Sequence, residues 1–254
     1  KVIDELTDWL KEQYSVKGLA FIKCNDGENF EGGISKFFDK DIQSKIINDL
    51  DIKKGDIIFM IGDKPKVALS ALGALRLKLA EKENLIEQDK WAPLWVVDFP
   101  LFEWNEDHER WDSLHHPFTS PNFEDIKQLD SNPGDVRSLG YDIVMNGYEI
   151  GGGSIRIHSK QLQSKIFKLL NIDDIEANEK FGFLMDAFKY GAPPHGGMAF
   201  GFDRLIMLLV GSKQIRDVIA FPKTTSAMSL MDDSPSIVDE KQLGELNLSI
   251  KEKK

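Results

Sequence analysis

Hydrophobic and polar positions in the first third of the chain alternate with the period of helices. Apolar residues at intervals of three and four predict amphipathic helices over residues 3–14 and 39–50, and alanines and leucines on one side predict a longer helix over residues 67–85. Short apolar runs bounded by glycine and aspartate turns lie between these segments and predict strands. The pattern predicts a small α+β domain over residues 1–86.

The remaining residues, 87–254, are richer in strand patterns. The almost wholly apolar residues 91–102 predict a buried strand that contains Asp98. Residues 141–149 combine two apolar runs with an Asn-Gly turn, which predicts a β-hairpin. Residues 216–224 predict a further strand that ends in a turn.

Residues 196–211 join a strand to a helix. Residues 198–202 predict a short buried strand interrupted by Gly201, and the apolar run after them predicts a buried helix with Asp203 near its N-terminus. Arg204 is unusual in the first turn, because the positive end of the helix dipole favours anions. A bound nucleotide phosphate would resolve this mismatch. The alternative, in which Arg204 pairs with an acidic side chain and Gly201 only relieves packing, is equally compatible with the pattern.

The predicted hairpin carries two acidic side chains. Pairing across its turn would set Asp142 and Glu149 opposite one another, and facing carboxylates repel unless a cation or a proton lies between them. Mg²⁺ bound through few carboxylates and the phosphates of a ligand suits this arrangement. The alternative is that each acid pairs with a lysine or arginine.

Three consecutive glycines follow the hairpin. Gly151, Gly152 and Gly153 enter a strand that they weaken, which is best explained by a ligand close to bare backbone. Three residues after Gly153, Arg156 shares a strand face with Ser154. Its planar guanidinium is costly in a strand unless it meets a carboxylate, which it can bind through two hydrogen bonds.

Adjacent histidines, His115 and His116, precede Pro117. Neighbouring side chains of an extended segment point opposite ways, so the two are a poor chelating pair. One of them facing a polar ligand is the functional interpretation. A histidine that is hydrogen-bonded for structural reasons is the alternative, which we favour for this motif taken alone.

Composition and charge narrow the class of protein. With 41% hydrophobic and 29% charged residues, the chain has the composition of an ordinary globular protein. Its net charge of -10 argues against non-specific nucleic-acid binding, although a local basic face is compatible with it. A lone Cys24 excludes a disulfide framework and a cysteine metal site, and a reducing cytoplasm is expected. No apolar run approaches the roughly 20 residues of a membrane span, and the opening residue, Lys1, indicates a fragment.

Four strings together resemble a known family. Residues 201–204 (GFDR) and the apolar helix after them resemble the third signature motif of class II aminoacyl-tRNA synthetases, placed at residues 196–211. Residues 114–118 (LHHPF), 148–156 (YEIGGGSIR) and 215–223 (IRDVIAFPK) are similar to bacterial-type aspartyl-tRNA synthetases.

The resemblance extends from Trp91 to the C-terminus, and residues 1–86 resemble the later part of the bacterial insertion (GAD) domain of that family. It implies an α+β fold, with a mainly antiparallel sheet flanked by helices and a smaller α+β insertion domain. It also implies ATP-dependent activation of L-aspartate to aspartyl-adenylate, followed by transfer to tRNA-Asp.

The resemblance implies a role for each candidate residue. Arg204 would hold the ATP γ-phosphate, and Asp142 and Glu149 would hold Mg²⁺ that bridges the phosphates. Arg156 would bind the aspartate side chain, and His115, with His116 nearby, would close over the aspartate. Further residues are implied to line the nucleotide and adenylate sites: Gly151, Gly152, Gly153, Gly201, Phe202 and Asp203.

The chain also departs from the family. Its first two signature motifs are absent, and no Phe-Arg-x-Glu string is present to supply the arginine expected at the α-phosphate. We therefore expect the chain to be the C-terminal part of a longer homodimeric enzyme and to be inactive alone. Whether the enzyme charges only tRNA-Asp or also tRNA-Asn is left open.

Two other functions are compatible with these motifs. A ligase joining ammonia to aspartate would use the same fold, but the insertion domain argues against it. A non-catalytic, synthetase-like tRNA-binding or regulatory module would explain the missing second motif. Against it, Asp142, Glu149, Arg156 and Arg204 are all present, and a degenerate site would be expected to lose some of them.

Overall fold

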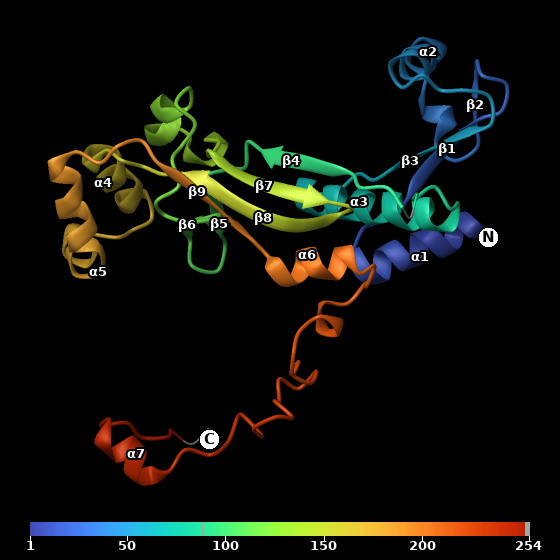
Figure 1. The fold of residues 1–254 in the computed structure, drawn as a ribbon. Helices are drawn as coiled ribbons and strands as arrows, with labels where there is room; N and C mark the ends of the chain where they lie inside the picture. Colours follow the sequence, from blue (N-terminus) through green and yellow to red (C-terminus); the bar gives the residue numbers. More distant parts are fainter. Residues whose placement is uncertain (88, 252–254) are drawn as a thin grey trace. The chain divides into compact units, whose positions relative to one another are not determined.

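The structure is a computed structural model that describes residues 1–87 and 89–251 (Figure 1). The chain divides into two compact units, residues 1–90 and residues 91–254. Both combine helices with antiparallel sheets, so the predicted α+β class is confirmed.

The first unit has a three-stranded antiparallel sheet in the order β2-β1-β3. Asp39 caps a helix by accepting a hydrogen bond from the backbone of Ile42 at 2.8 Å, and the helices predicted from periodicity are confirmed within a few residues. The elements are α1 (Val2–Tyr14), β1 (Ala20–Cys24), β2 (Phe30–Glu31), η1 (Ser35–Phe37), α2 (Lys40–Asp49), β3 (Asp56–Met60) and α3 (Pro65–Lys82).

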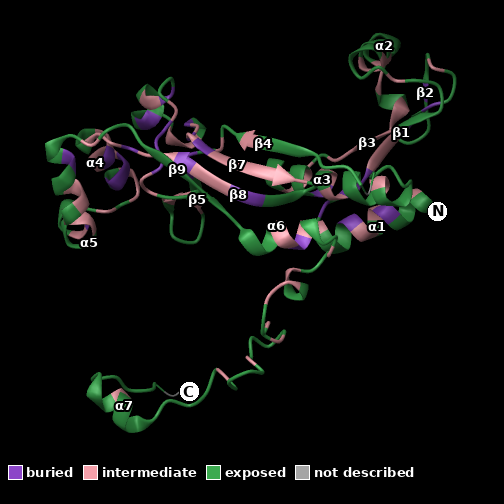
Figure 2. Cartoon of the chain, viewed as in Figure 1, coloured by how far each residue is buried: buried purple, intermediate pink, exposed green. Residues whose placement is uncertain are grey.

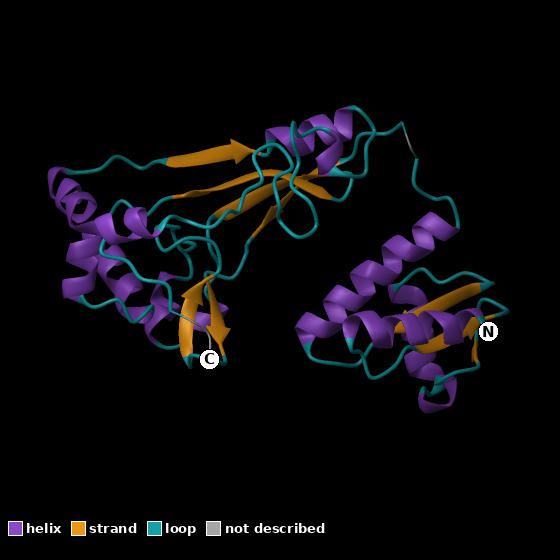
Figure 3. Ribbon diagram, turned by 90° about the horizontal axis from the view of Figure 1, so that it is seen from below, coloured by secondary structure: helices purple, strands orange, loops and turns teal. Residues whose placement is uncertain are grey.

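Each face of this sheet has a hydrophobic core. On one face α1 and α3 pack through Leu10 and Leu75 against Phe59 of β3. On the other face the buried Ile22 and its neighbours pack against apolar residues of α2, including Ile46. Alternation of side chains along the strands sends successive residues to opposite cores, and Figure 3 shows the helices and the sheet of this unit.

The second unit contains a four-stranded sheet in the order β4-β7-β8-β9 and a separate hairpin of β5 and β6, all antiparallel. The predicted hairpin is confirmed, with a turn at Asn146 and Gly147, whose positive φ angles of 51° and 85° match the turn that such a dipeptide favours. Its strands and helices are β4 (Pro93–Val97), β5 (Phe102–Asn105), β6 (Arg110–Ser113), β7 (Gly140–Met145), β8 (Tyr148–Ile155), α4 (Lys160–Leu169), α5 (Asp174–Ala187), β9 (Gly196–Phe200), α6 (Phe202–Leu209) and α7 (Glu240–Glu245). Short 3₁₀ helices are η2 (Ile126–Asp130), η3 (Pro133–Asp135), η4 (Phe188–Tyr190) and η5 (Ile215–Asp217).

The core of this unit lies beside the end of β8. Ile157, which is 1% exposed, packs with Leu129, Val136 and Ile166 of α4. A nearby ion pair fixes the loop around η2 and η3, because Arg137 donates to both carboxylate oxygens of the buried Asp125 at 2.8 and 3.0 Å. This contact lowers the pKa of Asp125. A rigid core therefore adjoins the residues that follow β8.

Two strands predicted to be buried are exposed. The run 91–102 forms only the five residues of β4, Asp98 lies beyond it with a positive φ of 58°, and Trp95 is 56% exposed. Every residue of β9 is exposed (Figure 2), and α6, predicted to be buried, has one buried residue, Met207. For the two strands the reason is topological, since β4 and β9 are the edges of their sheet and each pairs with one neighbour.

The strand predicted over residues 216–224 is wrong. Residues 215–217 form η5, and the rest of this run pairs with no strand among the described residues. A β-branched and apolar sequence needs a partner strand to form a ladder, and this run has none among the described residues.

Among helices of the described residues, none has both the length and the apolar character that a membrane span requires.

Candidate functional site

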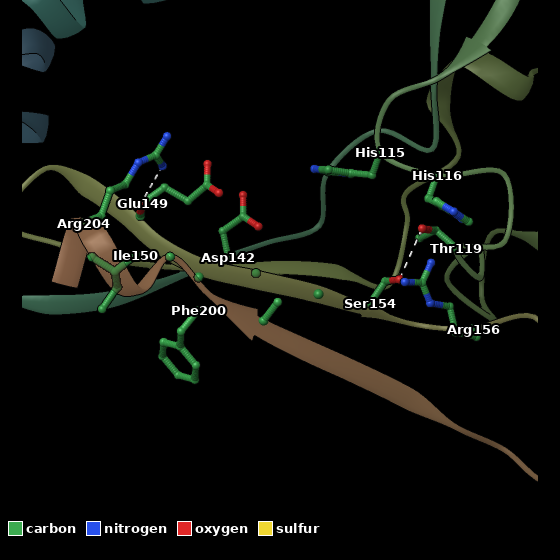
Figure 4. A pocket seen from close by; sticks show the side chains of 15 residues that line it. His115, His116, Thr119, Asp142, Glu149, Ile150, Ser154, Arg156, Phe200 and Arg204 are labelled. Carbon is green, nitrogen blue, oxygen red and sulfur yellow. Dashed lines mark hydrogen bonds between the residues drawn. The ribbon is translucent and has the colours of Figure 1, made fainter. Parts of the chain in front are cut away.

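Most of the candidate residues line one cavity of about 370 Å³ in the second unit. β7, β8, the junction of β9 with α6, and the loop before Thr119 contribute to its walls. Figure 4 shows Arg204 and Glu149 at one end and Arg156 at the other. Phe202 and Asp203 do not line the cavity; they lie in the exposed first turn of α6.

Arg204 lies at the end of the cavity formed by the start of α6. Gly201 is the N-cap of this helix, and its backbone N–H donates to Ile150 of β8 at 2.8 Å. Arg204 Nη1 donates to the backbone carbonyl of Glu149, also at 2.8 Å. Among the described residues Arg204 makes no ion pair within 4.0 Å, so its charge is uncompensated and available to an anion.

Asp142 and Glu149 line the cavity as a diagonal pair. The prediction that they lie opposite one another is wrong, because the two-residue Asn-Gly turn already pairs Glu149 with Val144. A β-bulge between Ile143 and Val144 then shifts the register so that Asp142 pairs with Gly152. Both carboxylates point to the same side of the sheet in Figure 4.

Neither of these two carboxylates has an ion-pair partner among the described residues. No cluster of three or more potential metal ligands is present in residues 1–87 and 89–251. Two oxygen donors fit Mg²⁺, which takes its remaining ligands from water and phosphate, and do not form a self-sufficient metal cage.

The three glycines have two different structural causes. A Cβ on Gly151 would lie 2.7 Å from the backbone oxygen of Ala199, and one on Gly153 would collide with the backbone oxygen of Gly197. At these two positions the close approach of β9 accounts for glycine without a ligand. All three glycines also line the cavity, so a ligand close to their backbone stays a prediction. A Cβ on Gly152 would collide with Asp142 Oδ1, so this glycine keeps the cavity side clear for the carboxylate.

Arg156 lies at the opposite end of the cavity, one residue beyond β8. Its backbone N–H donates to His195 at 2.9 Å, and the next residue, Ile157, is anchored in the core. Thr119 and Ser154, both buried, share a hydrogen bond of 3.3 Å between their hydroxyls beside it. Arg156 Nη1 is buried without a hydrogen-bond partner among the described residues, an arrangement that suits a carboxylate ligand.

His115 and His116 both line this cavity although they are adjacent, because their segment is a loop and not an extended strand. The backbone N–H of Phe118 donates to His116 Nδ1 at 3.2 Å. Burial, followed by the positive charge of Arg156, lowers the pKa of His116 from its usual 6.5. The neutral ring therefore carries its proton on Nε2 and can donate a hydrogen bond. His115 contacts Phe99 edge to face, with ring centroids 4.7 Å apart.

Sequence patterns did not identify Thr119 as part of the site. It is 2% exposed and forms an isolated β-bridge with Arg156, although 37 positions separate the two in the sequence. A single threonine between Phe118 and Ser120 carries no periodic signal, so only the tertiary pairing reveals it.

The cavity thus holds an unpaired guanidinium at each end and two carboxylates near one end. Residues 45–225 match the family model described as tRNA synthetases class II (D, K and N), and residues 1–72 match that of the GAD domain. The chain therefore belongs to the class II tRNA synthetases of the D, K and N group.

Two relatives with curated names are both ligases for aspartate. The chain is 49% identical over 250 residues to aspartate–tRNA ligase of Ruminiclostridium cellulolyticum, and 51% identical over 248 residues to aspartate–tRNA(Asp/Asn) ligase of Geotalea uraniireducens. Each match covers 98% of this chain and 42% of the relative, so the chain spans about two fifths of their length. A solved aspartyl-tRNA synthetase from Entamoeba histolytica matches 60% of this chain and 26% of its own, at 22% identity and a TM-score of 0.41.

Proposed function

We propose that this chain is the C-terminal part of an aspartate–tRNA ligase, which activates L-aspartate with ATP and transfers it to tRNA-Asp. The buried, unpaired Arg156 Nη1 at one end of the cavity is the observation that carries the proposal, because it calls for a carboxylate ligand. The free charge of Arg204 at the other end suits a phosphate. The names of relatives that are about half identical support the same reaction.

In this proposal the two ends of the cavity hold two reactants. Arg156 and the Nε2–H of His116, with His115 beside them, bind aspartate, and Arg204 binds the γ-phosphate of ATP. The α-carboxylate of aspartate attacks the α-phosphorus, the bond to the pyrophosphate oxygen breaks, and aspartyl-adenylate and pyrophosphate form. The chain contributes orientation and charge complementarity and needs no covalent intermediate.

Asp142 and Glu149 would hold a magnesium ion against the ATP phosphates. The ion would offset the negative charge of the phosphates. Gly152 keeps the Asp142 carboxylate free of a neighbouring side chain, and Arg204 is fixed to the Glu149 carbonyl beside them. The three side chains together present alternating charge to a triphosphate.

The N-terminal part of the relatives would complete the enzyme. We propose that the full-length protein is a cytoplasmic homodimer and that it supplies the arginine at the α-phosphate, which this chain lacks. Loss of such a contact costs about 10² or more in rate, so the 254-residue chain alone is expected to bind ligands without forming aspartyl-adenylate.

A calorimetric titration with a non-hydrolysable aspartyl-adenylate analogue tests the proposal. We expect the chain to bind the analogue, and Arg156→Ala to weaken binding by about 10²-fold or more because a buried carboxylate contact is lost. Arg76→Ala, which changes an exposed arginine of the first unit, is the control.

Binding of an asparaginyl-adenylate analogue as tight as that of the aspartyl analogue would contradict the substrate assignment. Binding of neither ligand, together with tRNA binding, would favour the non-catalytic module instead. The observation that favours a non-catalytic module is the absence of the Phe-Arg-x-Glu string. Charging assays of the full-length protein with tRNA-Asp and tRNA-Asn then determine its tRNA range.

A further inference from the structure

Two buried side-chain atoms lack a hydrogen-bond partner among the described residues, Arg156 Nη1 and Gln163 Oε1. A ligand carboxylate accounts for the arginine. The glutamine lies on α4, outside the lining of the cavity, and is 0% exposed. Burying a side-chain amide whose oxygen has no hydrogen-bond partner destabilises a fold. We therefore ask what the NH₂ group of Gln163 contributes in return.

The NH₂ group of Gln163 reaches the histidine loop. Its Nε2 donates to the backbone carbonyl of Pro117 at 2.8 Å, across 46 positions of sequence. Pro117 follows His116 directly and, as a proline, has no backbone N–H, so its carbonyl is its one backbone hydrogen-bonding group. Gln163 therefore connects a helix anchored in the core by Ile166 and Phe167 to the segment that carries the two histidines.

Bonds on either side of Pro117 orient His116. The backbone N–H of Phe118 donates to His116 Nδ1 at 3.2 Å, and the N–H of Thr119 donates to the His116 carbonyl at 3.0 Å. Phe118 is fixed in turn, because its carbonyl accepts from Ile157 at 2.9 Å. The loop is thus held to the end of β8 on one side of the proline and to α4 at the proline itself.

We propose that Gln163 is a positioning residue for aspartate recognition: through Pro117 it holds His116 with Nε2–H directed at the aspartate end of the cavity. The inference rests on the proposed function for its substrate and on the geometry for its mechanism. Gln163 touches no reactant, so it acts on aspartate and leaves ATP, bound at the Arg204 end, unaffected.

Because the oxygen of Gln163 is unpaired, an experiment can distinguish a positioning role of this residue from a role in stability. Gln163→Met keeps the length of the side chain while removing both the useful donor and the costly acceptor. The free energy of unfolding is therefore expected to stay unchanged or to rise, while the loop loses its tie. If Gln163 served stability alone, stability and ligand affinity would fall together.

The first measurement follows the imidazole of His116 by NMR titration of the 254-residue chain. The titratable and charged groups that line the two cavities beside this ring are Arg156, His195, His115, Asp142, Glu149 and Arg204. Loosening the loop in Gln163→Met admits water and moves the ring from Arg156, so the pKa of His116 is expected to rise towards 6.5. Gln161→Met, an exposed glutamine on the same helix, is the matched control and is expected to leave it unchanged. An unchanged pKa of His116 in Gln163→Met would overturn the proposal.

The second measurement is ATP–pyrophosphate exchange by the full-length enzyme. Gln163→Met is expected to raise KM for L-aspartate about tenfold, with KM for ATP changed less than about twofold and no loss of thermal stability. Gln163→Glu can donate to Pro117 only when protonated, so its defect relative to wild type should shrink as pH falls. Equal rises in both KM values would overturn the inference. Absence of exchange in the wild type would instead overturn the proposed function, and the NMR titration would still decide whether Gln163 positions His116.

Discussion

The two ends of the cavity are built on different principles. At the Arg156 end, hydroxyls of Thr119 and Ser154 are buried, and the loop is tied to β8 and to α4 by hydrogen bonds between 2.8 and 3.3 Å. At the Arg204 end, Arg204 and Glu149 are exposed, and one side-chain hydrogen bond joins them. The side chains at the Arg156 end are therefore held in place before a ligand binds, whereas those at the Arg204 end are exposed and charged.

This difference fits the ligands that we propose for each end. Aspartate is small, so discrimination against similar amino acids must come from a few groups held at fixed positions. A triphosphate with its metal ion carries several charges and keeps part of its hydration, so uncompensated charge on exposed side chains suffices. Constraint at the aspartate end and charge at the ATP end predict different responses to mutation.

Of the variants that test this difference between the two ends, Arg204→Ala is expected to change ligand affinity the most. Removal of the only unpaired cation at the ATP end of the described site should weaken binding of Mg²⁺·ATP by about 10²-fold in calorimetric titrations, because a charge-assisted contact is lost. Affinity for L-aspartate should stay within about threefold, since Arg156 and its ties are untouched.

Arg204→Lys separates charge from geometry. If charge alone matters at this end, lysine should restore most of the affinity for ATP, whereas Arg156→Lys should not restore aspartate binding, because only the guanidinium fork suits the constrained end. Full rescue at both ends, or at neither, would show that the two ends do not differ as described.

The sequence predicted elements whose pattern is local. Helices with clear periodicity, such as 3–14, and the Asn-Gly hairpin at 146–147 form as expected, because apolar periodicity and turn chemistry act within a few residues. The sequence also singled out four residues that line the cavity, Arg156, Arg204, Asp142 and Glu149. Arg156 is costly in a strand, Arg204 lies at the positive end of a helix dipole, and the two acids were expected to repel one another.

Features that depend on long-range pairing were not predictable. The apolar runs of β4 and β9 indicated burial, but their place at the edges of the sheet leaves them exposed. The register shift between Ile143 and Val144 changes the partner of Asp142 from Gly151 to Gly152, and no local pattern marks a bulge there. Gln163 resembles any helical glutamine in sequence, and only its burial against Pro117 distinguishes it.

The hairpin carboxylates offer an intermediate test. Asp142→Asn and Glu149→Gln should each raise, about tenfold, the Mg²⁺ concentration needed for half-maximal ATP binding, since each removes one of two negatively charged oxygen ligands. Glu179→Gln, an exposed acid on α5 outside the cavity, should have no effect on this requirement. An unchanged Mg²⁺ requirement in both variants would show that charge at the ATP end comes from Arg204 alone.

The smallest effect concerns the imidazole at the constrained end. The pKa of His116 is lowered in the folded chain, so between that lowered value and 6.5 the unfolded state binds more protons than the folded state. The free energy of unfolding should therefore rise with pH across this window and fall as pH drops through it. His116→Asn, which cannot be protonated, should remove this part of the dependence.

Urea unfolding of wild type and His116→Asn on both sides of the window, at about pH 5 and about pH 7.5, isolates the contribution, because the other histidines cancel in the comparison. The effect should be small, since His116 is exposed on one side. Identical pH dependence in the two proteins would mean that folding imposes no neutral state on this ring. The selectivity of the aspartate end would then come from Arg156 and the buried hydroxyls. The two ends of the cavity would differ only in how deeply these groups are buried.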